Sequence, residues 1–390
     1  MQPGRERSAL QPAEFGMAPE PLPQHAASRP TESRLNLVPR QIRAKPRASS
    51  RHGYCLETDM KIRSVLAGAV SALGLLAAQA QAEAPGEITV AYFLEWPLPF
   101  EAAKSLGTFE KELGVKINWR AFDTGTAMSA AFASGDVQYA ISQGVPPFVT
   151  AVSAGQDLIV IDAAVGYAEN DNCVVRSDLE ITRDNAKDLE GRKVGLPIGT
   201  APHFGFLKVA EHLGIDVSKV QVVDIAPAEA AAAFAAGNFD AVCGWGGPLR
   251  RMKEHGNVLL TGAEKEAIGI KIFDVVSTTS AFANEHPDLT AKLLKVINDA
   301  NDAWKSDPDS LLPLIAKDSG LDEQAAKDNL ATFTLLPIDE KLGPDWLGGG
   351  VQTYLKEVAD FFVSIGNIPQ ALPSYDAVVK SEFLAAAAKD

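Results

Sequence analysis

The stretch VKINWRAFDTGTAMSAAFASGDVQYAIS, residues 115–142, carries the clearest fold signal in the chain. Its first seven residues alternate between apolar and polar side chains, which predicts a β-strand. The segment TAMSAAFASG, 126–135, ends in a glycine and predicts a short helix with a glycine stop. The apolar run VQYAIS, 137–142, predicts another strand. A strand, a helix and a strand in this order favour parallel strands joined by a right-handed crossover.

The same alternation of strands and helices extends to both sides of this stretch. A first run covers about 87–165, and a second run of the same size and order starts near residue 173 and ends in the strand IFDVVSTTSA, 272–281. Residues after about 285 are predicted to be almost entirely helical. This pattern predicts an α/β protein with parallel sheets.

Two such runs predict two lobes. We expect residues 83–172 together with 277–390 to form lobe I, and residues 173–276 to form lobe II. Two strands that cross between the lobes leave a cleft with a hinge. Ligands bind at the carboxyl ends of the strands in such sheets, and the hinge allows the lobes to close around them.

The N-terminal 82 residues do not share this pattern. Residues 1–59 are rich in Pro, Arg, Ser and Gln, and we expect them to be a mis-assigned upstream extension, with Met60 as the true start. Residues 60–82 combine a basic start, an apolar run of 15 residues and a small-residue cleavage site. These features are typical of a signal peptide, with an N-terminal membrane anchor as the alternative. A signal peptide predicts export to the periplasm.

The charge balance argues against nucleic acid as a partner. The chain has 36 Lys and Arg against 50 Asp and Glu, and the first 82 residues hold 11 and 6 of these. The remainder therefore carries 25 basic against 44 acidic residues, a net charge of −19. A body this acidic repels phosphate backbones.

The cysteines do not indicate a metal site. Cys173 and Cys243 would meet an oxidising compartment after export, and the sequence leaves open whether they form a disulfide or remain two buried thiols. Two cysteines without clustered histidines lack metal-site spacing. We expect no metal and no cofactor.

Hydroxyl groups and glycines follow several predicted strands where a helix begins. Such helix starts offer free backbone N–H groups to an anion. The candidate anion-binding residues are Thr124, Gly125, Thr126, Ser142, Gln143, Gly144, Thr200 and His203. In GTAPHFGFL, 199–207, Pro202 suits the first helical position and His203 follows it beside the expected anion. The alternative for Thr124 is that it only caps the helix. The alternative for His203 is that it is a partly exposed helix residue without a role in binding.

Acidic and aromatic side chains supply the complementary half of the site. Glu95 and Trp96 follow the first strand, Trp245 ends another strand, and Asp274 lies in an apolar return strand. A buried carboxylate needs a partner, which a bound ammonium would supply, and an indole would cover that ammonium by a cation–π contact. The alternatives are an Arg partner for Asp274 and a solvated loop with a packed indole for Glu95 and Trp96. The candidates together describe a site for a short zwitterion.

The sequence does not indicate catalysis. It contains no nucleophile and base at a recognisable spacing, and none of the motifs GxSxG and HExxH or a phosphate-type Gly-rich loop. We therefore expect a binding protein and not an enzyme. An enzyme on the same fold is the alternative, with His203 as its candidate reacting group.

These residues resemble the periplasmic substrate-binding proteins of sulfonate, nitrate and taurine ABC transporters, the taurine branch above all. The likeness covers about 87–385 and rests on FDTG with ASGD in WRAFDTGTAMSAAFASGDVQYA, on Thr200 with His203, on Trp245, and on Phe273-Asp274-Val275. The segment YFLEWPLPF, 92–100, departs from the family pattern.

The resemblance implies a type II periplasmic-binding fold that closes around one ligand and delivers it to a membrane permease. It implies a taurine-like aminosulfonate as ligand, and a monomer as the usual state. Another sulfonate or a pyrimidine precursor is the alternative ligand. Fold analogy alone does not choose among these.

Overall fold

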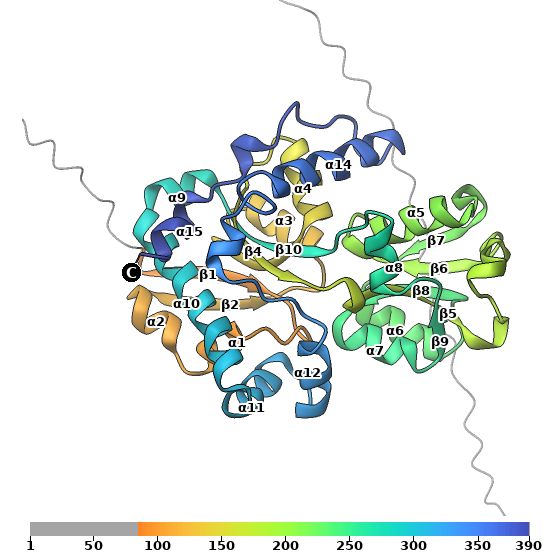
Figure 1. Cartoon of the computed structure of the whole chain (residues 1–390), viewed down its shortest axis with the longest axis horizontal. Helices are drawn as coiled ribbons and strands as arrows, with labels where there is room; N and C mark the ends of the chain where they lie inside the picture. The colour runs from red at the N-terminus through yellow and green to blue at the C-terminus, as the bar shows by residue number, and fades with distance from the viewer. Residues whose placement is uncertain (1–84, 390) are drawn as a thin grey trace, which may run out of the picture. The chain divides into compact units, whose positions relative to one another are not determined.

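The computed structural model describes residues 85–389, so the expected extension 1–59 and signal peptide 60–82 lie outside the described residues. The described chain contains two five-stranded sheets (Figure 1). The strands of the first sheet are β1 (Glu87–Tyr92), β2 (Lys116–Ala121), β3 (Tyr139–Gly144), β4 (Ile159–Gly166) and β10 (Phe273–Thr278). The strands of the second sheet are β5 (Asp171–Arg176), β6 (Lys193–Leu196), β7 (Gln221–Asp224), β8 (Ala241–Trp245) and β9 (Gly256–Val258).

The two sheets are built alike. The first has the order β2-β1-β3-β10-β4 and the second the order β7-β6-β8-β5-β9. In lobe I, β1 is parallel to β2 and β3, whereas β10, which returns from lobe II, is antiparallel to β3 and β4. In lobe II, β5, which enters from lobe I, is antiparallel to β8 and β9. The expected two-lobed α/β fold is confirmed.

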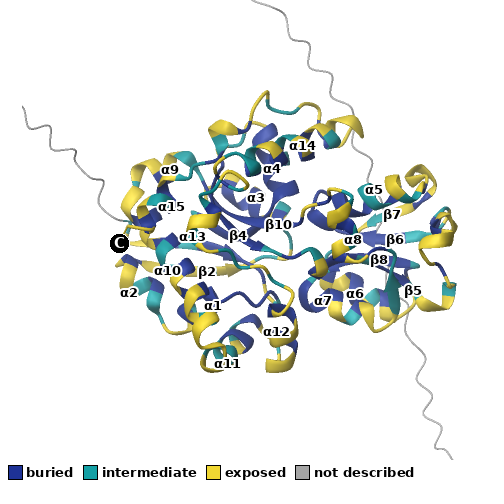
Figure 2. Cartoon of the chain, viewed as in Figure 1, coloured by how far each residue is buried: buried dark blue, intermediate teal, exposed yellow. Residues whose placement is uncertain are grey.

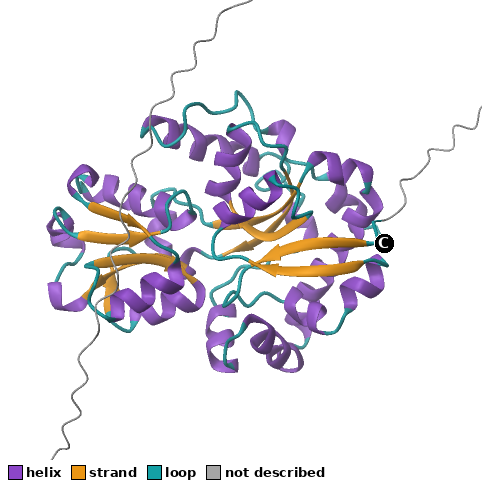
Figure 3. Ribbon diagram, turned by 180° about the vertical axis from the view of Figure 1, so that it is seen from behind, coloured by secondary structure: helices purple, strands orange, loops and turns teal. Residues whose placement is uncertain are grey.

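Two short segments connect the lobes (Figure 3). The chain leaves β4 through Tyr167 and the turn Ala168–Asn170, and it returns to β10 through residues 268–272. The Tyr167 N–H donates to the Ile272 carbonyl at 3.0 Å, which ties the segments together. The lobe boundary expected after residue 276 falls within β10, a strand of the first sheet.

Fifteen α-helices surround the sheets in residues 85–389. They are α1 (Phe100–Ser105), α2 (Thr108–Leu113), α3 (Gly125–Ala133), α4 (Val145–Ser153), α5 (Ala201–Leu213), α6 (Pro227–Ala235), α7 (Gly246–Lys253), α8 (Gly262–Ala267), α9 (Ser280–Glu285), α10 (Pro287–Ser306), α11 (Pro308–Ser319), α12 (Glu323–Leu330), α13 (Ile338–Lys341), α14 (Gly350–Ser364) and α15 (Glu382–Ala387). The segment FEAAKSLGTFEKEL, 100–113, has the sequence pattern of one helix, and the prediction of a single helix there is wrong, because the structure divides the segment into α1 and α2. Gly107 adopts a φ of 67°, a left-handed conformation that ends one helix and lets α2 begin in a new direction.

The helical C-terminal part is confirmed and enlarges lobe I. Helix α14 packs on α4, and α15 packs on α10 and β4. The inner strands of both sheets are buried under the helices, whereas the edge strands β2, β7 and β9 and the outer faces of the helices are partly or fully exposed (Figure 2). Lys341 of α13, 0% exposed, donates to Asp162 of β4 and to Asn298 of α10 at 3.0 and 2.9 Å. A buried charged network therefore anchors the C-terminal helices to the first sheet.

Lobe II contains a disulfide. Cys173 of β5 and Cys243 of β8 lie directly opposite each other in the antiparallel ladder, with their Cα atoms 3.9 Å apart, and are bonded. The alternative of two separate thiols is thereby excluded. The bond closes a long loop within lobe II, which favours the folded state by constraining the unfolded chain.

Residues 85–389 contain no helix that is both long and apolar enough to cross a bilayer.

Candidate functional site

Four helices begin at one pocket. The strand β3 ends at Gly144, the N-cap of α4, and β8 ends at Trp245, the N-cap of α7. Thr200, after β6, is the N-cap of α5, and α3 begins at Gly125, after β2. Two of these helices belong to each lobe. The first turns contain Pro146, Pro147, Pro202 and Pro248, which have no N–H. The other first-turn N–H groups lack intrahelical acceptors and lie at the positive ends of the helix dipoles, which makes the pocket suited to an anion.

The pocket is small, with a volume of about 20 Å³. Residues of both lobes and of the first connecting segment line it: Phe93, Gly125, Gly144, Pro147, Tyr167, Thr200, Ala201, Pro202, Trp245 and Asp274. Five of the predicted site residues are therefore brought together here, namely Gly125, Gly144, Thr200, Trp245 and Asp274. A space of this size admits one water-sized group, and a larger group requires the lining to shift.

Asp274 is the carboxylate of the pocket, and hydroxyl groups are its partners. Tyr167 donates its phenolic O–H to Oδ1 at 2.5 Å, and Ser142 donates to Oδ2 at 2.7 Å. Trp96 in turn donates its indole N–H to Ser142 Oγ at 2.8 Å. Burial raises the pKa of Asp274 to about 7, while the two hydroxyl donors oppose the shift. The alternative of an Arg partner does not occur: among the described residues, no Arg or Lys forms an ion pair with Asp274.

Ser142 has an unusual backbone. Its φ of 71° is in the left-handed region, which is costly for a residue other than glycine. Its side chain is buried between the indole of Trp96 and the carboxylate of Asp274. Ser142 and Trp96 thus form the wall behind Asp274 and do not line the pocket. Trp96, 2% exposed, packs on Tyr167 and Phe333, which supports the packed-indole alternative.

The stretch GTAPHFGFL begins α5 as expected, but its polar side chains form hydrogen bonds to the backbone of the turn and do not point to a ligand. Gly199 has a φ of 80°, and its N–H donates to His203 Nδ1 at 3.1 Å. Thr200 Oγ1 donates to the Pro197 carbonyl at 2.5 Å. Burial lowers the pKa of His203, and a ring nitrogen that accepts a hydrogen bond is neutral at neutral pH. This stretch therefore presents backbone amides to the pocket, while His203 stays behind them.

Glu95 reaches the other lobe. Its carboxylate accepts from the guanidinium of Arg251 on α7, with N–O distances of 2.5 and 3.3 Å. Its backbone carbonyl accepts from the N–H of Gly247, also on α7, at 3.1 Å. We name this contact between Glu95, Gly247 and Arg251 the lobe clamp. The partner of Glu95 in this structure is thus an arginine of the protein.

A second, wider cavity of about 180 Å³ adjoins the pocket and shares Phe93 and Trp245 with it. The rings of these two residues lie 5.6 Å apart, centre to centre. Glu95 and Asp123 supply its acidic groups, and the other lining residues are apolar or small: Leu94, Ala121, Phe122, Ala226, Pro227, Ala228 and Pro248. A ligand held in the pocket would extend its tail past the two rings into this cavity.

The remaining predicted residues lie close by without lining the pocket. Thr124 caps α3, accepting from the Ala127 N–H at 3.2 Å, and its hydroxyl bonds to that of Thr126 at 2.9 Å. Gln143 is fully buried and donates to Ser129 Oγ at 2.9 Å. The capping role of Thr124 and the core position of Gln143 follow from these contacts.

Sequence reasoning missed five lining residues: Phe93, Pro147, Tyr167, Ala201 and Pro202. Phe93 and Tyr167 each follow directly on a strand of the first sheet, and position after a strand is the signal that would have identified them. Tyr167 is the most informative omission, because it joins the connecting segment to the carboxylate of the pocket.

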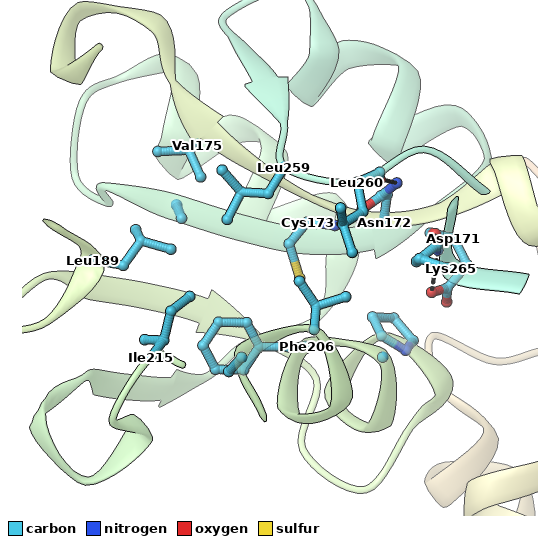
Figure 4. A pocket seen from close by; sticks show the side chains of 15 residues that line it. Asp171, Asn172, Cys173, Val175, Leu189, Phe206, Ile215, Leu259, Leu260 and Lys265 are labelled. Atoms are coloured by element: carbon cyan, nitrogen blue, oxygen red, sulfur yellow. Dashed lines mark hydrogen bonds and ion pairs between the residues drawn. The ribbon is translucent and has the colours of Figure 1, made fainter. Parts of the chain in front are cut away.

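Another cavity lies inside lobe II, beside the disulfide (Figure 4). Leu189, Phe206 and other apolar side chains line most of it, and Asp171 and Lys265 occupy one end. The Lys265 Nζ lies 3.8 Å from Asp171 Oδ1 and donates to the Asp171 carbonyl. Because the cavity is buried between β5, β8 and α5 and its charges are already paired, it does not suit a soluble anion. Among residues 85–389, no cluster of three or more His, Cys, Asp or Glu side chains could hold a metal ion.

Comparisons with known proteins identify the family and agree with the fold. The profile of the family described as NMT1/THI5 like matches residues 98–311. The taurine-binding periplasmic protein of Escherichia coli K12 is 28% identical over 322 residues, covering 81% of this chain and 97% of that protein.

Two solved structures are similar in fold. The alkanesulfonate-binding protein SsuA from Xanthomonas axonopodis pv. citri, bound to MOPS, has a TM-score of 0.64 at 21% identity, covering 77% of this chain and 100% of that one. The periplasmic aliphatic sulphonate binding protein SsuA from Escherichia coli has a TM-score of 0.62 at 23% identity, covering 76% and 93%.

Proposed function

The chain belongs to the NMT1/THI5-like family, and on that basis we propose that it is a periplasmic solute-binding protein for taurine or a related small aminosulfonate. It would capture the ligand between its lobes and deliver it to the permease of an ABC importer. The observation that carries the proposal is the pocket itself, where four helix N-termini from two lobes surround a buried carboxylate.

The chemistry of the pocket fits both ends of a zwitterion. A sulfonate is a compact, permanently charged anion with three acceptor oxygens, which suits converging amide N–H groups from different helices. An ammonium two carbons away would lie against Asp274, whose carboxylate retains acceptor capacity beyond the bonds from Tyr167 and Ser142. Lobe closure would exclude water and strengthen each of these charged contacts.

The proposal favours binding over catalysis. The one candidate reacting group is His203. Its Nδ1 accepts a hydrogen bond from the Gly199 N–H in the turn before α5, and the residue does not line the pocket. The E. coli relative that covers most of the chain is named as a binding protein.

Titration calorimetry with three ligands tests the function. We expect taurine to bind about tenfold or more tightly than ethanesulfonate, which lacks the amine, because a hydrogen bond between charged groups contributes about 1.5–3 kcal/mol. Nitrate, which has neither tail nor amine, should bind most weakly. Equal affinity for taurine and ethanesulfonate at pH 8, where Asp274 is expected to be ionised, would exclude a role of the carboxylate in binding the amine. Failure of both ligands to bind would refute the proposed function.

A second candidate ligand is a larger or aromatic sulfonate. The wider cavity beyond Phe93 and Trp245 favours it, because two aromatic rings at its entrance would pack against a flat or long tail. Adding benzenesulfonate to the same titration separates the candidates: binding tighter than that of taurine would identify the aromatic ligand.

The lobe clamp gives a prediction that separates two roles of Glu95. If its carboxylate holds the lobes together, Glu95→Gln and Arg251→Gln should each weaken taurine and ethanesulfonate binding equally, by about 2- to 5-fold. If its carboxylate holds the ammonium, Glu95→Gln should weaken taurine binding alone. Given the Arg251 partner, we expect the first outcome.

The matched control is Arg250→Gln. Arg250 is the neighbouring residue on α7 and pairs with Glu254 on an exposed face, at 3.2 Å. This variant should leave both affinities unchanged. Raising the ionic strength should weaken binding to the native protein more than binding to the Glu95→Gln protein, because salt screens the partly exposed clamp.

A further inference from the structure

We propose that the proton on Asp274 decides which sulfonates the protein accepts. Ionised Asp274 would favour a sulfonate that carries an ammonium, and protonated Asp274 would favour a sulfonate that carries none. The inference rests on the proposed function, because it places a sulfonate in this pocket. It goes beyond that function by making ligand selectivity depend on pH through a single side chain.

The partners of Asp274 leave both of its protonation states available. A fixed Arg or Lys partner would hold the carboxylate ionised, but the chain supplies the hydroxyls of Tyr167 and Ser142 instead. A hydroxyl donates to a carboxylate and can turn to accept from a carboxylic acid. The side chain is 2% exposed, so water does not stabilise the charge either.

The two ligand classes place different demands on this carboxyl group. A sulfonate without an amine brings a second negative charge into a pocket that already holds Asp274, and two like charges in a buried site repel. Protonation of Asp274 removes that repulsion. An aminosulfonate brings its own ammonium, which the ionised carboxylate attracts and the protonated group does not. Each ligand therefore selects a different form of the same residue.

The charged groups around Asp274 place its change of protonation near neutral pH. Burial raises its pKa to about 7, and the negative charge of Asp171 acts in the same direction. Asp171 is itself paired with Lys265, and its own pKa is raised by burial to about 6. Burial raises the pKa of Tyr167 well above its usual value, so the phenol stays protonated. Because burial lowers the pKa of His203, that imidazole adds no charge. The Glu95–Arg251 pair faces the adjoining cavity.

The expected pH dependence has opposite signs for the two ligands. Taurine affinity should fall about tenfold per pH unit below pH 7, where Asp274 takes up a proton. Ethanesulfonate affinity should fall about tenfold per pH unit above pH 7. A sulfonate stays ionised throughout, and a primary ammonium titrates well above this range, as Lys does with a pKa of about 10.4. The ratio of the two affinities should therefore change about 100-fold between pH 6 and pH 8.

Calorimetry of the native protein with taurine and with ethanesulfonate at pH 6, 7 and 8 tests the proposal directly. Each titration is run in two buffers of different ionisation enthalpy, which counts the protons exchanged on binding. We expect taurine to release close to one proton at pH 6 and ethanesulfonate to take up close to one at pH 8. A constant affinity ratio and no proton exchange, with both ligands bound, would overturn the inference and leave the proposed function intact. Absence of binding by either ligand at every pH would instead overturn the proposed function.

Two variants locate the proton. Asp274→Asn, which keeps the shape of the side chain, should make the affinity ratio independent of pH, although Asp171 still titrates. Tyr167→Phe removes a donor that stabilises the carboxylate, so the pH at which the two affinities are equal should move upward. A merely structural role of Tyr167 would not shift this pH. An unchanged pH of equal affinity would contradict the assignment of the proton to Asp274. If either variant fails to fold, the proton count on the native protein decides alone.

Discussion

Replacing Gly144 with alanine is expected to lower the affinity for taurine at least about 100-fold, equivalent to about 2.7 kcal/mol. Gly144 lines the pocket, and a Cβ at this position would lie 3.5 Å from Asp274 Oδ1 and 3.5 Å from Pro147 Cδ. These are ordinary contact distances, so the protein itself accommodates the methyl group. The pocket, at about 20 Å³, does not accommodate a methyl group and a sulfonate together.

The backbone at Gly144 supports this separation of binding from folding. Its φ of −63° and ψ of 145° are open to any residue. The thermal midpoint of Gly144→Ala should therefore stay close to that of the native protein, while calorimetry records the loss of binding. The control is Gly86→Ala, next to the opposite end of β1, where a Cβ would contact nothing within 4 Å. Taurine binding by Gly144→Ala with native affinity would show that the ligand does not occupy this pocket.

Replacing Lys341 with methionine should lower the free energy of unfolding by about 3–5 kcal/mol. Lys341 and Asp162 are both 0% exposed and lie 3.0 Å apart, nitrogen to oxygen. Removing the ammonium leaves the Asp162 carboxylate buried with only the Asn298 amide as a donor, and its Oδ1 has no partner even in the native protein. A buried charge that loses its counter-ion keeps its full desolvation cost.

Urea unfolding followed by circular dichroism measures this change, and a surface pair provides the matched control. Lys356 and Asp360 form an i,i+4 ion pair on the exposed side of α14, at 2.5 Å. Lys356→Met should change the unfolding free energy by less than about 1 kcal/mol, because solvent screens that pair. If Lys341→Met had an effect as small as that of Lys356→Met, the buried network would not be what anchors the C-terminal helices to β4.

Much of the architecture could be predicted from local patterns. The alternation of apolar and polar residues in 115–121 and the glycines at or near the ends of several helices identify strands and helices, because these signals act between neighbours in the chain. Both α/β runs and the helical C-terminal part followed from them. The break at Gly107 was missed because a glycine inside a helical pattern is compatible with a continuous helix until packing imposes a positive φ.

The part of the site formed by the first turns of helices could be predicted from the sequence. Gly125, Gly144 and Thr200 stand where a strand gives way to a helix, and that position alone indicates exposed amide groups. Asp274 stood out as a charge within an apolar strand. Which group satisfies that charge could not be predicted, since Tyr167 is 107 positions away and Ser142 is 132 positions away along the chain.

Local patterns in the sequence were enough to predict the α/β class, the two lobes and the amide groups at the helix starts, because each depends on interactions that repeat every two to four residues. The packing of the folded chain was needed to show that Arg251 faces Glu95, that Trp96 lies behind Ser142, and that Tyr167 contacts Asp274. These contacts depend on the topology, because a buried polar group finds its partner on whichever strands and connections lie beside it in the fold. Strand order, and not spacing along the chain, sets those neighbours.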